Sequence, residues 1–235
     1  YLASMSCFFI ACGIMFFLHY NFSVKGKTPI SLDHLLGGFS FIRGNKVILG
    51  SVSLDMFAVL LGGATALLPI VAKDILHTGP WGLGLLRCAP ALGALLMSIY
   101  LARRPLEHSV GKIMFAAVTV FGVATILFGL SESLFLSMFA LVLLGASDMI
   151  SVVIRSTLVQ LETPDEMRGR VSAANSVFIG SSNQLGEFES GVTAAWFGVV
   201  PAIVIGGVGT IAIVGIWMYL FPHLVQRNQL EKAND

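Results

Sequence analysis

Residues 134–154 read LFLSMFALVLLGASDMISVVI, an apolar run that contains one charged residue, Asp148. A run of about 20 apolar residues is the length that an α-helix needs to cross the ~30 Å hydrocarbon core of a bilayer. Six further stretches have a similar length and composition: Leu2–Tyr20, Val47–Ala72, Trp81–Ala102, Ile113–Leu130, Val171–Trp196 and Val199–Phe221. The sequence therefore predicts an all-α integral membrane protein with seven spans.

The composition supports this class and excludes others. The chain is 56% hydrophobic and 11% charged, which leaves too little polar surface to coat a water-soluble globule. The apolar runs are continuous and lack the ten-residue alternation of an outer-membrane β-barrel. A formal net charge of +1 gives no basis for nucleic-acid binding, and the three cysteines lie within spans without metal-ligand spacing. We expect no nucleic acid, metal or cofactor.

Basic residues predict the orientation, because Lys and Arg favour the cytoplasmic side of short loops. They concentrate in segments 21–46, 103–112 and 155–170 and in the C-terminal tail, whereas the other loops contain only Lys73. These segments and the C-terminus are therefore predicted to be cytoplasmic, in a plasma membrane that we take to be a bacterial inner membrane. Leu32–Ile42 is amphipathic and is expected to lie along the membrane surface.

The chain begins with Tyr1 inside an apolar stretch, without an initiating Met or a leading polar segment. We therefore interpret it as part of a longer protein. The expected division is a last span of an N-terminal half, a central cytoplasmic loop, a six-helix bundle and a cytoplasmic tail, at residues 1–20, 21–46, 47–222 and 223–235.

Four of the seven predicted spans contain ionisable residues: Asp55, Arg87, Asp148, and Glu187 with Glu189. An ionised side chain at mid-bilayer costs roughly 2.5–3.5 kcal/mol, so such residues face a bundle interior or a watery cavity. The second, third, fifth and sixth spans are therefore expected to line the interior, and the first, fourth and seventh to face lipid. This grouping predicts two consecutive three-helix units of opposite orientation, the inverted-repeat arrangement of many secondary carriers.

The sixth span is the least apolar, because Asn183 and Gln184 accompany its two glutamates. It is retained as a span because the basic segments on both sides of the region 171–221 require two crossings. Asn183 shares a helical face with Glu187, whereas Glu189 points elsewhere. We interpret Asn183 and Gln184 as polar residues of a cavity.

Helix arithmetic at ~1.5 Å per residue suggests contacts between charged residues. Arg87 and Glu187 lie at similar depths from the outer side, which predicts an ion pair between them. Asp148 and Arg155 are seven residues apart and share one face, with Arg155 at the cytoplasmic border. For each charge, a structural ion pair or helix clamp is the alternative to a role in transport.

Five segments together resemble the second half of major facilitator superfamily transporters, in particular the efflux branch that includes enterobactin exporters. TPDEMRGRVS at 163–172, NSVF at 175–178 and GSSNQLG at 180–186 are similar to the loop and helix between the tenth and eleventh spans of that superfamily. LDMFAVLLGGA at 54–64 and LLRCAPALGA at 85–94 are similar to its seventh and eighth spans. The cytoplasmic loop motif includes Arg168, Gly169 and Arg170.

The resemblance implies a twelve-span fold, to which this chain contributes the last span of the first half, the central loop and the complete second half. It also implies proton-coupled export by alternating access, with a missing N-terminal half, protons, the lipid bilayer and a small-molecule substrate as partners. The proton-coupling candidates are Asp55, Asp148 and Glu187, and by analogy the substrate is an amphipathic drug or siderophore. The superfamily's glycine–aspartate–arginine motif is reduced here to ARRP at 102–105 with Gly111 and Lys112, without the aspartate.

Other classes fit the residues less well. A retinal photoreceptor needs a Schiff-base lysine in a late span, and the last two spans contain none. An intramembrane protease needs a histidine base, but no histidine lies within a span beside Ser181 and Ser182. A seven-span receptor, a channel or a structural subunit remains open, although scattered single charges do not form the rings of a pore. We do not expect an enzyme.

Overall fold

The computed structural model describes residues 2–17, 32–104, 106 and 108–227, and every regular element within these ranges is helical. The chain divides into two units. The first contains α1, Leu2–Phe17, which lies within the first predicted span. The second contains all later elements. The expected loop residues 21–31 and tail residues 228–235 lie outside the described ranges.

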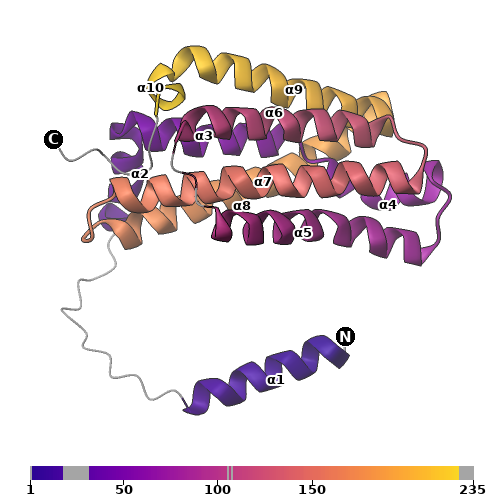
Figure 1. The fold of residues 1–235 in the computed structure, drawn as a ribbon, viewed down its shortest axis with the longest axis horizontal. Coiled ribbons are helices and arrows are strands. Elements are labelled where there is room, and N and C mark those ends of the chain that lie inside the picture. Colours follow the sequence, from indigo (N-terminus) through magenta and orange to yellow (C-terminus); the bar gives the residue numbers. More distant parts are fainter. Residues whose placement is uncertain (1, 18–31, 105, 107, 228–235) are drawn as a thin grey trace. The chain divides into compact units, whose positions relative to one another are not determined.

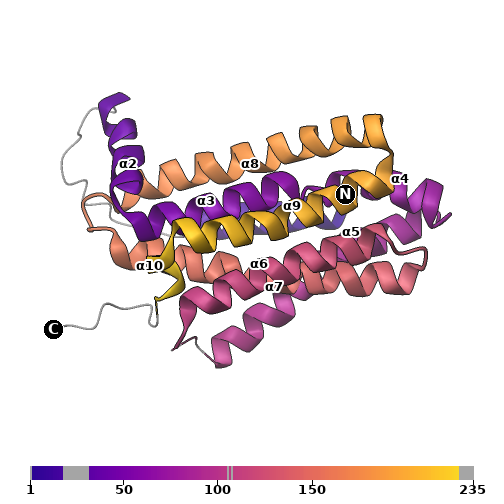
Figure 2. The ribbon, with the colours of Figure 1, turned by 90° about the horizontal axis from the view of Figure 1, so that it is seen from above.

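Six long helices form the second unit and lie side by side (Figure 1). They are α3 Lys46–Leu61, α5 Pro80–Arg103, α6 Val110–Gly129, α7 Leu134–Glu162, α8 Arg168–Phe197 and α9 Val199–Leu220. The unit also contains the short helices α2 Leu32–Gly44, which lies across one end of the bundle (Figure 2), and α10 Pro222–Val225. The all-α fold class predicted from the sequence is confirmed.

The second predicted span is a broken helix. After α3 ends at Leu61, the chain forms a 3₁₀ turn at Ala64–Leu67, the short helix α4 at Leu68–Ile70 and a π-helical turn at Val71–Ile75. The break begins at Gly62 and Gly63, before the proline of α4. Irregular backbone of this kind is tolerated at membrane depth where other protein segments or a cavity surround it.

Five segments are both long and apolar enough to cross a membrane: Lys46–Ile75, Pro80–Arg103, Val110–Gly129, Leu134–Glu162 and Val199–Leu220. The α8 helix has 30 residues, which corresponds to about 45 Å, but its composition is too polar to be among them. The α1 helix has 16 described residues and is shorter than the other spans. The structure thus supports α8 as a membrane-length helix, although hydropathy alone does not identify it.

The helix pairings follow the predicted inverted repeat. The α5 and α6 helices both pack on α7, while α8 and α9 both pack on α3, and α6 also packs on α9. If α3, α5 and α6 are exchanged with α7, α8 and α9 in that order, the pairings of α5 and α6 with α7 become the pairings of α8 and α9 with α3. The α6–α9 pairing is unchanged by the exchange. The two three-helix units therefore share their main pairings, whereas the α8–α9 contact has no α5–α6 counterpart of comparable size.

Glycines permit close backbone approach at corresponding interfaces. A Cβ atom at Gly145 of α7 would collide with the Pro90 carbonyl of α5, and one at Gly93 of α5 would collide with α7 in turn. At the equivalent α3–α8 interface, a Cβ at Gly186 would lie 2.9 Å from the Leu60 carbonyl oxygen. Small residues are the usual means by which membrane helices approach closely.

The fourth predicted span, which was expected to face lipid, is the most buried of the five apolar spans within this unit. In α6, 56% of the most apolar window is buried, compared with 22% in α5. Met114, Phe115 and Phe128 of α6 are fully buried between α7 and α9. Protein interior and lipid are both apolar, so the absence of charge cannot distinguish a core-facing from a lipid-facing surface.

Candidate functional site

A cavity of about 320 Å³ lies between the two three-helix units. Its wall is built from α3, the following 3₁₀ turn, α5, α6, α7 and α8. Most lining residues are small or apolar: Val59, Gly62, Gly63, Pro90, Ala91, Ala94, Phe121, Leu144 and Gly145. The helices that approach closely at these glycines thus enclose a space large enough for part of a small-molecule ligand.

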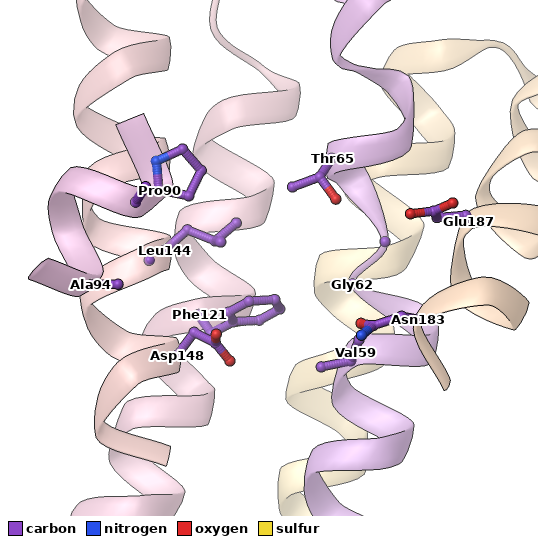
Figure 3. A pocket seen from close by; sticks show the side chains of 13 residues that line it. Val59, Gly62, Thr65, Pro90, Ala94, Phe121, Leu144, Asp148, Asn183 and Glu187 are labelled. Carbon is purple, nitrogen blue, oxygen red and sulfur yellow. The ribbon is translucent and has the colours of Figure 1, made fainter. Parts of the chain in front are cut away.

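Polar groups enter this cavity from opposite sides (Figure 3). Asp148 lies beside Phe121 on one side, whereas Glu187 and Asn183 of α8 lie on the other with Thr65. Among the described residues that line the cavity, the charged ones are the two acids, and none is basic. Asn183 and Glu187 lie on one face of α8, as their spacing predicts.

Two predicted polar residues of α8 are absent from the cavity lining. Gln184 is exposed, and Glu189 is half-buried, with Oε1 accepting a hydrogen bond of 2.9 Å from the Thr193 hydroxyl. The Glu189 carboxylate therefore has its hydrogen-bond partner one turn further along the same helix.

A buried ion pair lies on the side of the cavity nearer the loop between α7 and α8. Arg155 Nη2 is 3.2 Å from Asp55 Oδ2, and both side chains are almost completely buried. Arg155 Nη1 also donates a hydrogen bond of 3.4 Å to Asn175 Oδ1. The guanidinium therefore connects α3, α7 and α8 in one polar cluster.

This cluster gives Arg155 a partner that the sequence did not predict. The structure buries its side chain in the bundle and pairs it with Asp55, which lies beside Asp148. Sequence spacing describes one helix, whereas the long arginine side chain reaches a neighbouring helix. Removing one partner of such a buried pair leaves an uncompensated charge, which costs about 3–5 kcal/mol.

Asp148 lies where the cavity and the ion pair meet. Besides lining the cavity, it lines a second void of about 10 Å³ together with Asp55, Ser147 and Ser151. Its side chain is half-buried, while Asp55 is 5% exposed and Glu187 is exposed. Within the described ranges, no group of three or more His, Cys, Asp or Glu side chains is placed to hold a metal ion.

The predicted Arg87–Glu187 ion pair is not formed. Both side chains are exposed, no salt bridge joins them in the described part of the chain, and Arg87 does not line the cavity. Their similar depth is not sufficient, because α5 packs mainly on α7 whereas α8 packs on α2, α3 and α9. Depth along a span predicts height in the bundle but not which neighbour a helix has.

The loop motif lies at the end of the bundle away from the cavity. Arg168 forms an exposed ion pair of 2.7 Å with Asp165, and Arg170 is half-buried beside Met167. Gly169 has open space around it. These contacts are local to the start of α8.

A second ion pair at this end was not predicted. Arg227 Nη2 is 2.8 Å from Glu162 Oε1, and Asn45 Nδ2 donates to Glu162 Oε2 over 3.4 Å. Asn45 also caps α3, because its Oδ1 accepts hydrogen bonds from the amides of Val47 and Ile48. The contact ties the start of α3, the end of α7 and the C-terminal segment together.

Comparison with known proteins extends this description. The family described as transmembrane secretion effector matches residues 38–234. The enterobactin exporter EntS of Citrobacter koseri is 28% identical over 191 residues, which cover 80% of this chain and 45% of that protein. The enterobactin exporter EntS of Escherichia coli O1:K1 is 29% identical over 143 residues, covering 60% of this chain and 34% of that protein.

The chain thus spans less than half the length of these curated relatives. No solved structure matches it significantly.

Proposed function

This chain belongs to the transmembrane secretion effector family of the major facilitator superfamily, and from that premise we propose that it takes part in secondary active export. The proposed cargo is an amphipathic small molecule, either a drug or a siderophore, moved out of the cell in exchange for protons. The curated relatives are enterobactin exporters, which supports efflux rather than catalysis.

The observation that carries this proposal is the cavity between the two three-helix units. Its apolar wall of small residues and Phe121 suits the apolar part of an amphipathic ligand, and Asp148, Glu187, Asn183 and Thr65 supply polar contacts. Ligand sites commonly combine an apolar wall with a few convergent polar groups. In secondary carriers, substrate and coupling-ion sites lie near the membrane midplane at the interface between repeats.

Among the three carboxylates, Asp148 is the best placed to carry the exchanged proton. Asp55 is already neutralised by Arg155, and Glu187 is exposed. Asp148 faces the cavity and also adjoins the Asp55–Arg155 pair, so its protonation can be sensed by substrate and by the buried charges together. A proton that binds one conformation more tightly than the other shifts the balance between inward- and outward-open states.

The proposed architecture completes the cavity with a further helical half. The bundle described here supplies one wall, and an N-terminal half supplies the opposite wall in the twelve-span arrangement. The basic segments 103–112 and 155–170 then lie in the cytoplasm with the C-terminus, in a bacterial inner membrane.

Thiol labelling of the full-length protein tests whether this cavity is the transport path. In a background with Cys7, Cys12 and Cys88 replaced by serine, Ala94→Cys introduces a thiol into the cavity wall. Ser98→Cys introduces one on the same helix at a half-buried position outside the cavity. Export of ethidium and of a catecholate siderophore from vesicles is measured before and after treatment with a bulky maleimide.

Modification of the Ala94→Cys protein is expected to stop export of the transported probe, and that probe in excess is expected to slow the modification. Modified Ser98→Cys protein should export normally. Unchanged export by fully modified Ala94→Cys protein would show that the substrate takes another route.

A further inference from the structure

The cavity between the two three-helix units presents acidic groups to its interior. Asp148 of α7 and Glu187 of α8 are the charged side chains among the described residues that line it. They extend toward the cavity from opposite walls (Figure 3). A carboxylate at membrane depth is costly unless a positive charge compensates it. What supplies that positive charge therefore decides what the cavity binds.

Neither carboxylate is compensated inside the bundle. The side chains of Asp148 and Glu187 form no salt bridge with another residue in the described ranges. The guanidinium of Arg155 is paired with Asp55 at 3.2 Å and lies outside the cavity lining. Arg87 is exposed and is also absent from the lining. The wall that this chain supplies thus carries uncompensated negative charge.

The rest of the wall suits an organic cation better than an anion. The ring of Phe121 lies beside Asp148 (Figure 3), and an aromatic face attracts a cation that lies over it. The side-chain hydrogen-bond donors of the described lining are the Thr65 hydroxyl and the Asn183 amide, whereas ionised carboxylates only accept. An anion would therefore meet few donors, and the two carboxylates would repel it.

We infer that this cavity selects organic cations, and that Glu187 determines the preference by supplying a carboxylate that the cation neutralises. The inference rests on the proposed function, because it names the substrate class of the same cavity. Asp148 is the residue assigned to the exchanged proton, so Glu187 supplies the negative charge that remains when Asp148 is protonated. Of the two proposed cargoes, a cationic amphipathic drug therefore fits the cavity, whereas a deprotonated catecholate siderophore does not.

Binding of tetraphenylphosphonium to the purified full-length protein in detergent tests this selectivity. Radiolabelled tetraphenylphosphonium is titrated by equilibrium dialysis at fixed pH and ionic strength, with protein-free micelles as the blank. Competition by triphenylphosphine oxide is measured in the same assay. The two probes share three phenyl rings on phosphorus, but only the first carries a positive charge. The cation is expected to bind at least ~10-fold more tightly than the neutral probe, because only the cation compensates the carboxylates.

Variants of α8 locate the effect. Glu187→Gln removes a cavity carboxylate at nearly constant shape and is expected to weaken tetraphenylphosphonium binding ~10-fold, with little change for triphenylphosphine oxide. Glu189→Gln is the matched control, because Glu189 lies on the same helix, bonds the Thr193 hydroxyl and does not line the cavity. Asn183→Asp adds a carboxylate to the same wall and should strengthen cation binding, which keeps the test decisive if the Glu187→Gln protein does not fold.

Three results would overturn the inference. One is equal affinity for the two probes, or no saturable binding of the cation. Another is cation binding that is unchanged in both Glu187→Gln and Asn183→Asp, which would mean that groups of the N-terminal half compensate the acids. The third is export of the catecholate siderophore but not of ethidium, which would retain the proposed function. By contrast, cation binding that depends on Glu187, in a protein that exports neither ethidium nor the siderophore, would retain the selectivity and contradict the proposed function.

Discussion

Separating the Asp55–Arg155 pair should destabilise the bundle strongly, and removing both partners together should not. The closest nitrogen and oxygen atoms are 3.2 Å apart, with side-chain exposures of 4% for Arg155 and 7% for Asp55. At an effective dielectric constant of ~20, two unit charges at this distance attract by about 5 kcal/mol. Desolvation offsets much of that attraction in the intact pair, whereas a lone buried charge keeps the penalty.

The perturbations are Asp55→Asn, Arg155→Gln and the double variant of the full-length protein. Each single variant is expected to lose ~3–5 kcal/mol of unfolding free energy, while the double variant should lose less than the sum by at least ~2 kcal/mol. Reversible unfolding in mixed detergent micelles at one pH supplies the four free energies. Asp74→Asn, at an exposed carboxylate in the turn after α4, controls for the general effect of the substitution.

Losses that add within ~0.5 kcal/mol would refute this reasoning, because contacting charges cannot behave independently. The Asn175 partner would then have to hold Arg155 on its own.

Three further predictions address packing, orientation and the contact between α7 and the C-terminal segment. Gly145→Ala should destabilise the bundle by more than ~2 kcal/mol because its Cβ meets the α5 backbone, whereas Gly191→Ala has open space and should be neutral or slightly stabilising by thermal unfolding. An impermeant maleimide applied to intact cells should label Thr78→Cys but not Ser109→Cys, and the reverse labelling would invert the proposed orientation. Glu162→Gln should lower the unfolding free energy by ~1–3 kcal/mol, because it weakens the contact between α7 and the C-terminal segment. An unchanged unfolding free energy would mean that solvent replaces this contact.

The positions of most helices follow from the sequence because hydrophobic length is a local property. The predicted span Ile113–Leu130 and the observed α6, Val110–Gly129, differ by only a few residues at each end. Helix ends beyond the membrane are less predictable, since α7 continues from the expected Ile154 to Glu162. Hydropathy detects the part that suits hydrocarbon, but a helix continues wherever its polar end finds partners.

The candidate site was only partly predictable. Asp55 and Asp148 were identified correctly as residues of the bundle interior, because charge within an apolar run is visible in the sequence. Their surroundings were not, since the pairing of Arg155 with Asp55 on a neighbouring helix was not predicted. Which side chains meet across helices depends on helix rotation and neighbour choice, and neither is encoded in the depth of a residue along its own span.

The assignment of the exchanged proton to Asp148 decides how export is driven. Its most direct test uses proteoliposomes containing the full-length protein, with a transported probe and an imposed pH gradient, and records uphill export and downhill exchange of that probe. For Asp148→Asn, whose amide resembles the protonated acid, we expect uphill export to be lost while exchange persists. Glu187→Gln, at the exposed acid of the same cavity, is the matched comparison. Uphill export by the Asp148→Asn protein at an unchanged rate, with its pH dependence preserved, would contradict the claim.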